Sequence, residues 1–223
     1  MIGEGIRIIV LIMGRKKRIW YPGAIYHVMS RGNHQAALFK DNADYLHFLD
    51  IIKEARDYYH FKLHSLCLMT NHFHMVIETA GDELWRIMQR ILHKYCMDFN
   101  SKYNLKGHLF ESRYTASIIE TDKYFMEVSR YIHLNPVKAC MVKRAIDYEY
   151  SSYRQFIHTQ SYYNTGPAEK VLSELIDTSR VLEYFGYDSR EEYRKFVEGK
   201  ISHEEQENLI RKEMRENDLW LPR

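Results

Sequence analysis

The chain has 223 residues, of which 45% are hydrophobic and 28% are charged, which suits one sizeable domain with an appendage. Its 32 Lys and Arg residues nearly cancel its 30 Asp and Glu residues. This balance excludes a highly charged disordered chain and gives no overall basic signature of nucleic-acid binding. Cys67, Cys96 and Cys140 are odd in number and far apart, which argues against a disulfide framework and a secreted protein.

The charge is unevenly distributed along the chain. Residues 13–150 carry 20 Lys and Arg against 15 Asp and Glu, whereas residues 151–223 carry 11 against 14. A basic first part and an acidic second part indicate two parts with different roles. A solvated charged surface is the plainer explanation of the same counts.

The N-terminal segment contains an apolar run, Ile6–Met13, that is too short to span a bilayer, for which about 20 residues are needed. The basic run Arg15–Arg18 follows it, whereas a secretory signal peptide begins with its basic residues. We therefore expect a cytoplasmic protein. We interpret residues 1–12 as an N-terminal extension ahead of a natural start at Met13, or as a loose strand.

The predicted elements mix strands and helices. Runs rich in β-branched and aromatic residues predict strands, and apolar residues three and four apart predict helices. In chain order these are a strand at 24–30, a helix near 45–59, strands at 62–69 and 75–77, a helix after 82, a strand at 113–120, and a helix near 124–132 that ends at Pro136. This order predicts an α+β fold of the ferredoxin-like, split βαβ type, with an antiparallel sheet and two helices on one face. The third helix is available to cover the other face.

The second half of the chain changes character after residue 148. Residues 148–163 are rich in Ser, Tyr and Gln, and Gly166-Pro167 follows, which is typical of a linker. Helical patterns resume at 168–175 and after Ser189 and Ser202, each of which begins a Ser-x-x-Glu capping box. We therefore predict an extension at 1–12, a main domain at 13–155 and a helical C-terminal appendage at 156–223.

Two histidines lie two residues apart in Asn71-His72-Phe73-His74. Strand side chains alternate, so His72 and His74 point to one face, while Phe73 points to the face that the helices bury. Two neutral imidazoles side by side can hold one divalent cation. The alternative is a pair of exposed or hydrogen-bonded histidines on an edge strand, because His-x-His often occurs by chance.

The segment Tyr131-Ile132-His133-Leu134-Asn135-Pro136 offers a nucleophile and a further ligand. Helix positions four apart share a face, so Tyr131 and Asn135 point together and His133 points away. Pro136 restricts the backbone of Asn135, which makes that geometry approximate. The alternative is that Tyr131 is a core residue on the same face as the apolar residues before it.

These motifs belong to a larger set of matches to one family. The matching segments are, in order, Arg18–Asn33, Leu68–His74, Gly107–Tyr114, Tyr131–Ala139 and Tyr150–Tyr153. Through them the chain resembles the REP-associated tyrosine transposases, a bacterial branch of the HUH single-strand DNA transposases with an IS200-like domain. The ordered set is specific, whereas each match alone is weak.

The resemblance implies a ferredoxin-like fold and a mechanism. His72 and His74 fall on the paired metal-binding histidines, Tyr131 on the nucleophilic tyrosine, and Asn135 on a polar third metal ligand. Mg²⁺ or Mn²⁺ would polarise the phosphate and stabilise the leaving 3′ oxygen. Attack by the tyrosine leaves a 5′-phosphotyrosine link that keeps the energy of the broken bond for rejoining. The expected reaction is single-strand DNA cleavage and strand transfer, the chemistry of DNA transposition. The expected location is the bacterial nucleoid.

The expected partner is single-stranded DNA with hairpin-forming repeats. A flexible basic arm that can reach phosphates comprises Arg15, Lys16, Lys17 and Arg18. Basic residues in or beside the matched segments that can line a DNA channel are Arg31, Arg113, Arg130 and Lys138. Solvated surface is the alternative for each of them. Both a homodimer that exchanges the tyrosine helix and a monomer are consistent with the resemblance.

Two other functions are weighed against a transposase. A hairpin-specific DNA-binding protein without strand-transfer activity would need none of Tyr131, His72 and His74. An unrelated ferredoxin-like module with a structural or zinc-binding His-x-His pair leaves the ordered matches unexplained. The sequence therefore favours a DNA transposase.

Overall fold

A computed structural model describes residues 20–158 and 166–199, together with Glu204, Asn208 and Ile210. The elements are β1 (Ile25–Arg31), η1 (Asn33–Gln35), α1 (Asn42–Tyr59), β2 (Lys62–Met69), β3 (His72–Glu78), α2 (Leu84–Tyr103), β4 (Thr115–Ile118), α3 (Asp122–Lys138), η2 (Ala145–Asp147), α4 (Tyr153–Ile157), α5 (Pro167–Leu175), α6 (Ser179–Leu182), η4 (Glu183–Phe185) and α7 (Ser189–Glu198). The predicted extension at 1–12 and the basic arm lie outside the described residues.

The sheet has the strand order β2-β3-β1-β4, and every neighbouring pair is antiparallel. The predicted α+β class and antiparallel sheet are confirmed. The strand predicted at 75–77 begins at His72, so both histidines lie on β3. Because β3 lies between β2 and β1, it is an internal strand and not the edge strand of the alternative interpretation.

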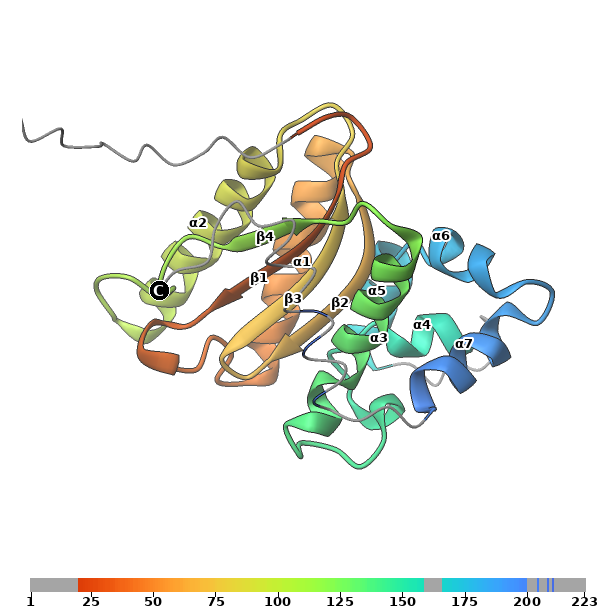
Figure 1. Cartoon of the computed structure of the whole chain (residues 1–223). Helices are drawn as coiled ribbons and strands as arrows, with labels where there is room; N and C mark the ends of the chain where they lie inside the picture. The colour runs from red at the N-terminus through yellow and green to blue at the C-terminus, as the bar shows by residue number, and fades with distance from the viewer. Residues whose placement is uncertain (1–19, 159–165, 200–203, 205–207, 209, 211–223) are drawn as a thin grey trace, which may run out of the picture.

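The two faces of the sheet differ in polarity. On one face, Phe73 packs against Phe48 of α1 with ring centroids 5.2 Å apart, and α1 and α2 cover this apolar core (Figure 1). The opposite face carries polar residues, including His27, Ser65 and His74. Helix α3 covers it, since Ser65 Oγ lies 2.8 Å from Ser129 Oγ of α3. The third helix therefore covers the second face, as the sequence allowed.

Helix α3 runs further than predicted. Its N-cap Thr121 accepts a hydrogen bond from the Tyr124 backbone N–H at 3.2 Å. The prediction that Pro136 ends the helix is wrong, because α3 continues to Lys138. A proline in the last turn removes only one backbone bond. The turn still closes, because the Ala139 N–H donates to the Asn135 carbonyl at 2.9 Å.

The C-terminal helices pack directly onto the main domain. At the open edge of β2, the Asp177 N–H donates to the Leu63 carbonyl at 2.9 Å. On α7, the Tyr193 hydroxyl lies 2.7 Å from Ser129 Oγ and 2.8 Å from His133 Nδ1, so α7 is fixed to the back of α3. The predicted boundary between residues 155 and 156 falls inside α4.

Two further expectations concern helix starts and membranes. Helix α7 begins at Ser189, but its N-cap is Asp188 and no side chain makes the predicted capping bond. The second predicted capping box, at Ser202, lies largely outside the described residues. Within the described part of the chain, no helix combines the length and the apolar character that crossing a bilayer requires.

Candidate active site

Strand β3 places His72 and His74 on the face of the sheet that α3 covers. Their ring centroids lie 5.2 Å apart with perpendicular ring planes. His74 is only 2% exposed, whereas His72 is half-buried. Strand alternation puts the two imidazoles side by side at the boundary between the protein interior and solvent.

Asn71 orients the ring of His72. The His72 Nδ1 lies 2.7 Å from Asn71 Oδ1, and the Asn71 amide nitrogen donates to the Gln35 carbonyl at 3.3 Å. Because an amide oxygen only accepts, His72 Nδ1 carries the ring proton and Nε2 keeps a lone pair. Burial lowers the pKa of His72, and the charge of Arg31 lowers it further, so the neutral ring is favoured.

His27 of β1 makes the corresponding contact with His74. The His27 Nε2 lies 3.1 Å from His74 Nδ1, and the two rings stack with centroids 5.3 Å apart. Burial lowers the pKa of His74 well below its usual range, and the charges of His27, His72 and Lys138 lower it further. Burial also lowers the pKa of His27 to about 4. Both rings are therefore neutral at neutral pH.

Helix α3 brings Tyr131 to these histidines within the same chain. The Tyr131 ring centroid lies 5.4 Å from that of His74 and 6.1 Å from that of His27, edge to face in both cases. Lys138, two turns further along α3, places its Nζ 4.6 Å from the centre of the Tyr131 ring. Tyr131 is half-buried: it packs against the hydrophobic core and turns its ring toward His74 and His27.

Asn135 lies one turn after Tyr131. Its amide nitrogen donates to the Tyr131 carbonyl at 2.8 Å, which ties the side chain to the turn that carries the tyrosine. This bond uses the amide nitrogen and not the oxygen that would bind a metal. The role of Asn135 as a third ligand stays a prediction. His133 points to the other side of α3, as expected, and is fully buried.

The donor atoms fit a divalent cation that keeps part of its coordination for substrate. Among the described residues, no three His, Cys, Asp or Glu side chains gather into a metal site. A metal here would therefore depend on the imidazoles of His72 and His74 and on an uncharged oxygen. Cys67 faces His74 across the strands, but it is fully buried, and burial raises the pKa of its thiol. It is thus a small core residue and not a ligand.

Arg31 and Lys138 are the predicted DNA-contacting residues that lie beside the histidines and the tyrosine. Arg31 pairs with His72 in the sheet register and is exposed. Its guanidinium forms an exposed ion pair with Glu111, with Nη2 2.9 Å from Oε1. Arg113 is exposed on the segment before β4. The remaining predictions, Arg15, Lys16, Lys17 and Arg18, lie outside the described residues.

Arg130 is a correction to the predicted DNA surface. It is only 6% exposed, and its Nη2 donates to the Gly199 carbonyl at 2.8 Å. The guanidinium also lies over the Phe196 ring, 4.8 Å from its centre. Since adjacent helix residues point in different directions, Arg130 contacts the C-terminal appendage while Tyr131 faces the histidines. Sequence alone could not place α7 against this residue.

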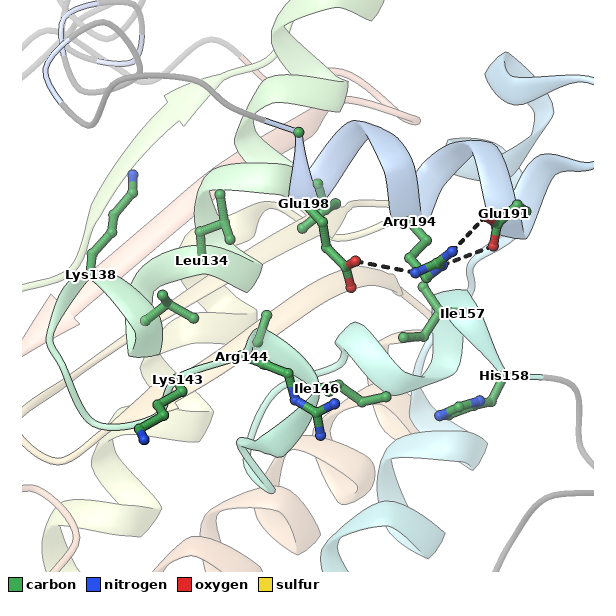
Figure 2. Close-up of a pocket in the computed structure, with 14 residues that line it drawn as sticks. Leu134, Lys138, Lys143, Arg144, Ile146, Ile157, His158, Glu191, Arg194 and Glu198 are labelled. Atoms are coloured by element: carbon green, nitrogen blue, oxygen red, sulfur yellow. Dashed lines mark hydrogen bonds and ion pairs between the residues drawn. The ribbon is translucent and has the colours of Figure 1, made fainter.

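A cavity of about 750 Å³ lies between the C-terminal end of α3, the segment around η2, and α7 (Figure 2). Its lining includes Leu134, and its arginines are already paired with carboxylates. Arg194 lies between Glu191 and Glu198, and the Arg144 Nη2 lies 2.6 Å from Asp147 Oδ1. The lining also includes Lys138, whose Nζ lies over the Tyr131 ring, so the cavity borders the surface around Tyr131.

Sequence reasoning missed His27 and the orienting role of Asn71. The available signal for His27 was a single histidine in the apolar stretch at 24–29, a polar residue that must find a hydrogen-bond partner when buried.

Comparisons with known proteins are consistent with this geometry. The family model described as "Transposase IS200 like" matches residues 21–135, just over half of the chain. A Haemophilus influenzae protein named as a REP-associated tyrosine transposase is 27% identical over 132 residues, which cover 53% of this chain and 74% of that protein.

A solved structure described as a REP-associated tyrosine transposase bound to a REP hairpin has a TM-score of 0.56 at 19% identity. The match covers 68% of this chain and 89% of that one, and at this identity it supports the fold alone. With the family model extending from the start of the sheet to the helix that carries Tyr131, the chain belongs to the IS200-like transposase family.

Proposed function

We propose that this transposase cleaves and rejoins single-stranded DNA at hairpin-forming repeats, through a 5′-phosphotyrosine intermediate on Tyr131. The observation that carries the proposal is the position of the Tyr131 ring, edge to face with His74 in the same chain at a centroid distance of 5.4 Å. The proposed nucleophile and the two proposed metal ligands thus meet on one face of the sheet. No second copy of the chain is needed to assemble them, so a homodimer remains a separate prediction.

The histidines provide the binding atoms for Mg²⁺ or Mn²⁺ in this proposal. Asn71 holds His72 with its Nε2 lone pair available, and Asn135 offers an amide oxygen as the third ligand. A bound divalent cation would polarise the scissile phosphate and stabilise the leaving 3′ oxygen.

Tyr131 performs the bond exchange. Its phenol oxygen attacks the phosphorus, and the bond between the phosphorus and the 3′ oxygen breaks. The phenol loses its proton, and the leaving 3′ oxygen gains one. The positive charge of Lys138, 4.6 Å from the ring centre, stabilises the negative charge that develops on the phenol oxygen. Attack of a 3′-hydroxyl on the phosphotyrosine reverses the reaction and rejoins a strand. This step needs no ATP, because the phosphotyrosine link conserves the bond energy.

The DNA partner follows from the surface charge and the relatives. Arg31 and Lys138 border the tyrosine and histidines, and Arg113 is an exposed cation on the segment before β4. These side chains can contact phosphates of a single strand beside a hairpin. The related solved structure is described as bound to a REP hairpin. We expect this chain to bind a hairpin of the same kind.

Formation of a covalent protein–DNA adduct tests this function. Incubating the purified chain with Mn²⁺ and a hairpin oligonucleotide that carries single-stranded flanks should give an adduct that survives denaturing electrophoresis. Tyr131→Phe should abolish the adduct and leave hairpin binding largely intact, because only the hydroxyl is removed. Tyr187→Phe, at a fully exposed tyrosine, is the matched control and should react like the wild type.

The outcomes separate the alternatives. An adduct that survives Tyr131→Phe removes Tyr131 from the mechanism. A wild-type chain that binds the hairpin with either metal but forms no adduct would instead be a hairpin-binding protein without strand-transfer activity.

A further inference from the structure

We propose that His27 is a positioning residue that holds His74 in the tautomer able to bind a metal. This inference rests on the metal site of the proposed function. His27 lies on β1, one strand away from His74, and its Nε2 is 3.1 Å from His74 Nδ1. The pair is fully enclosed, with both residues 2% exposed, so water does not compete for this hydrogen bond.

The direction of the hydrogen bond decides whether His74 can be a ligand. If His74 Nδ1–H donates to His27 Nε2, the His74 Nε2 keeps its lone pair and can bind a cation. If His27 Nε2–H donates instead, the proton of His74 lies on Nε2 and blocks metal binding. A neutral His27 that accepts is therefore what a metal at this place requires.

The same arrangement recurs at the other histidine. Asn71 accepts from His72 Nδ1 at 2.7 Å, and an amide oxygen leaves no choice of direction. Both imidazoles of the pair are thus bonded through Nδ1 to a neighbour, and in both the Nε2 is the nitrogen left for a ligand. One neighbour comes from the residue before His72, and the other comes from an adjacent strand.

A purely packing role does not explain an imidazole at position 27. His27 Nδ1 is buried and has no hydrogen-bond partner among the described residues. An unpaired buried polar atom costs about 1–3 kcal/mol, which an apolar side chain of similar size would avoid. What the imidazole adds over such a side chain is its bond to His74.

Imidazole nitrogen NMR of the metal-free full-length protein tests the tautomer directly. We expect His74 as the Nδ1–H form in the wild type. In His27→Gln the side-chain oxygen can still accept, so the Nδ1–H form should persist. In His27→Phe the acceptor is gone, and His74 should shift toward the Nε2–H form. A wild-type His74 found as the Nε2–H tautomer would overturn the inference.

Mn²⁺ affinity, measured by calorimetry on the same proteins, gives a second readout. His27→Phe should weaken Mn²⁺ binding by about 10- to 100-fold, as loss of an outer-sphere partner does, while His27→Gln should stay close to the wild type. Met29→Leu, beside His74 on the same face, is the control for altered packing and should leave Mn²⁺ affinity unchanged. Thermal unfolding shows whether each variant folds. If His27→Phe does not fold, the same measurements are made on His27→Leu, which also lacks a hydrogen-bond acceptor.

The two proposals fail in different ways. Equal Mn²⁺ affinity in the wild type and in a folded His27→Phe protein overturns the positioning role and leaves the metal site intact. A wild type that binds no Mn²⁺ removes the metal site, and the positioning role falls with it.

Discussion

Two groups of buried or half-buried histidines lie on the polar side of the sheet, and they use their nitrogens differently. In the structural group, His64 and His133, both ring nitrogens are bonded within the fold. His133 Nδ1 is 2.8 Å from the Tyr193 hydroxyl, and its Nε2 is 2.8 Å from Ser152 Oγ. In the proposed metal-site group, His27, His72 and His74, the hydrogen bonds among the described residues involve one nitrogen of each ring.

This difference separates the two kinds of histidine better than burial does. His74 and His133 are both almost completely buried, and burial lowers the pKa of both. A ring with both nitrogens bonded to the fold has no capacity left for a ligand. A ring that is bonded through one nitrogen is oriented and still able to bind.

His133 lies on the side of α3 away from Tyr131, whereas His64 lies on β2 and contacts Phe125 of the same helix. The front of α3 carries Tyr131 toward His74, and its back carries Ser129 and His133 toward Tyr193 of α7. The C-terminal appendage thus packs against one side of the helix while Tyr131, the proposed nucleophile, faces His74 on the other. Replacing members of the two groups should therefore affect different properties, namely reaction at the front and stability at the back.

The largest effect is expected for His72→Ala in the adduct assay. Loss of a metal ligand removes several kcal/mol of transition-state stabilisation, so adduct formation should fall by about 1,000-fold. The free energy of unfolding should change by less than about 1 kcal/mol, because the His72 ring is only half-buried and such substitutions usually change stability little. His47→Ala, at an exposed histidine on α1, is the control and should keep its activity. Full activity in His72→Ala would remove His72 from the proposed metal site.

The second effect is on stability, in His133→Leu. Leucine fills a similar volume but leaves the Tyr193 and Ser152 hydroxyls without this partner, which should lower the free energy of unfolding by about 3 kcal/mol. Urea unfolding measures this loss, and adduct yield per folded molecule should stay near the wild type. Tyr193→Phe, which removes the hydroxyl at the other end of the bond, should reproduce part of it. A loss below about 1 kcal/mol would mean that the network behind α3 contributes little.

The sequence predicted the front of this arrangement better than the back. Strand alternation puts His72 and His74 together, and helical spacing separates Tyr131 from His133, so both follow from local geometry. The contact of His27 with His74 depends on β1 lying beside β3, which is decided by sheet pairing across 47 residues. The burial of Arg130 depends in the same way on where α7 packs. Pro136 was misread because a proline near a helix end removes only one backbone bond.

His64 provides the most specific contrast within the structural group. Its Nδ1 is 3.0 Å from the Asp177 carbonyl and its Nε2 is 2.9 Å from Glu78 Oε2. Both ring nitrogens of His64 are therefore bonded within the fold, one to a carbonyl and the other to a carboxylate. The hydrogen bond from His64 lowers the pKa of Glu78 to about 2 from its usual 4.5, and Arg180 adds to this effect.

The smallest expected effect is a pH-dependent stabilisation by the Glu78 carboxylate, which Glu78→Gln should lack. Because the pKa of Glu78 is lower in the folded protein, its charge stabilises the fold above about pH 4.5, and this stabilisation is lost as the pH falls toward about 2. We expect the wild type to exceed Glu78→Gln by about 1 kcal/mol in unfolding free energy at pH 6, since solvent screens the carboxylate. Urea unfolding between pH 6 and 2 should show this difference shrinking, and Glu54→Gln, at an exposed pair with Lys94, controls for removal of a carboxylate. A difference that persists unchanged at low pH would show that Glu78 acts through its shape and hydrogen bonds and not through its charge.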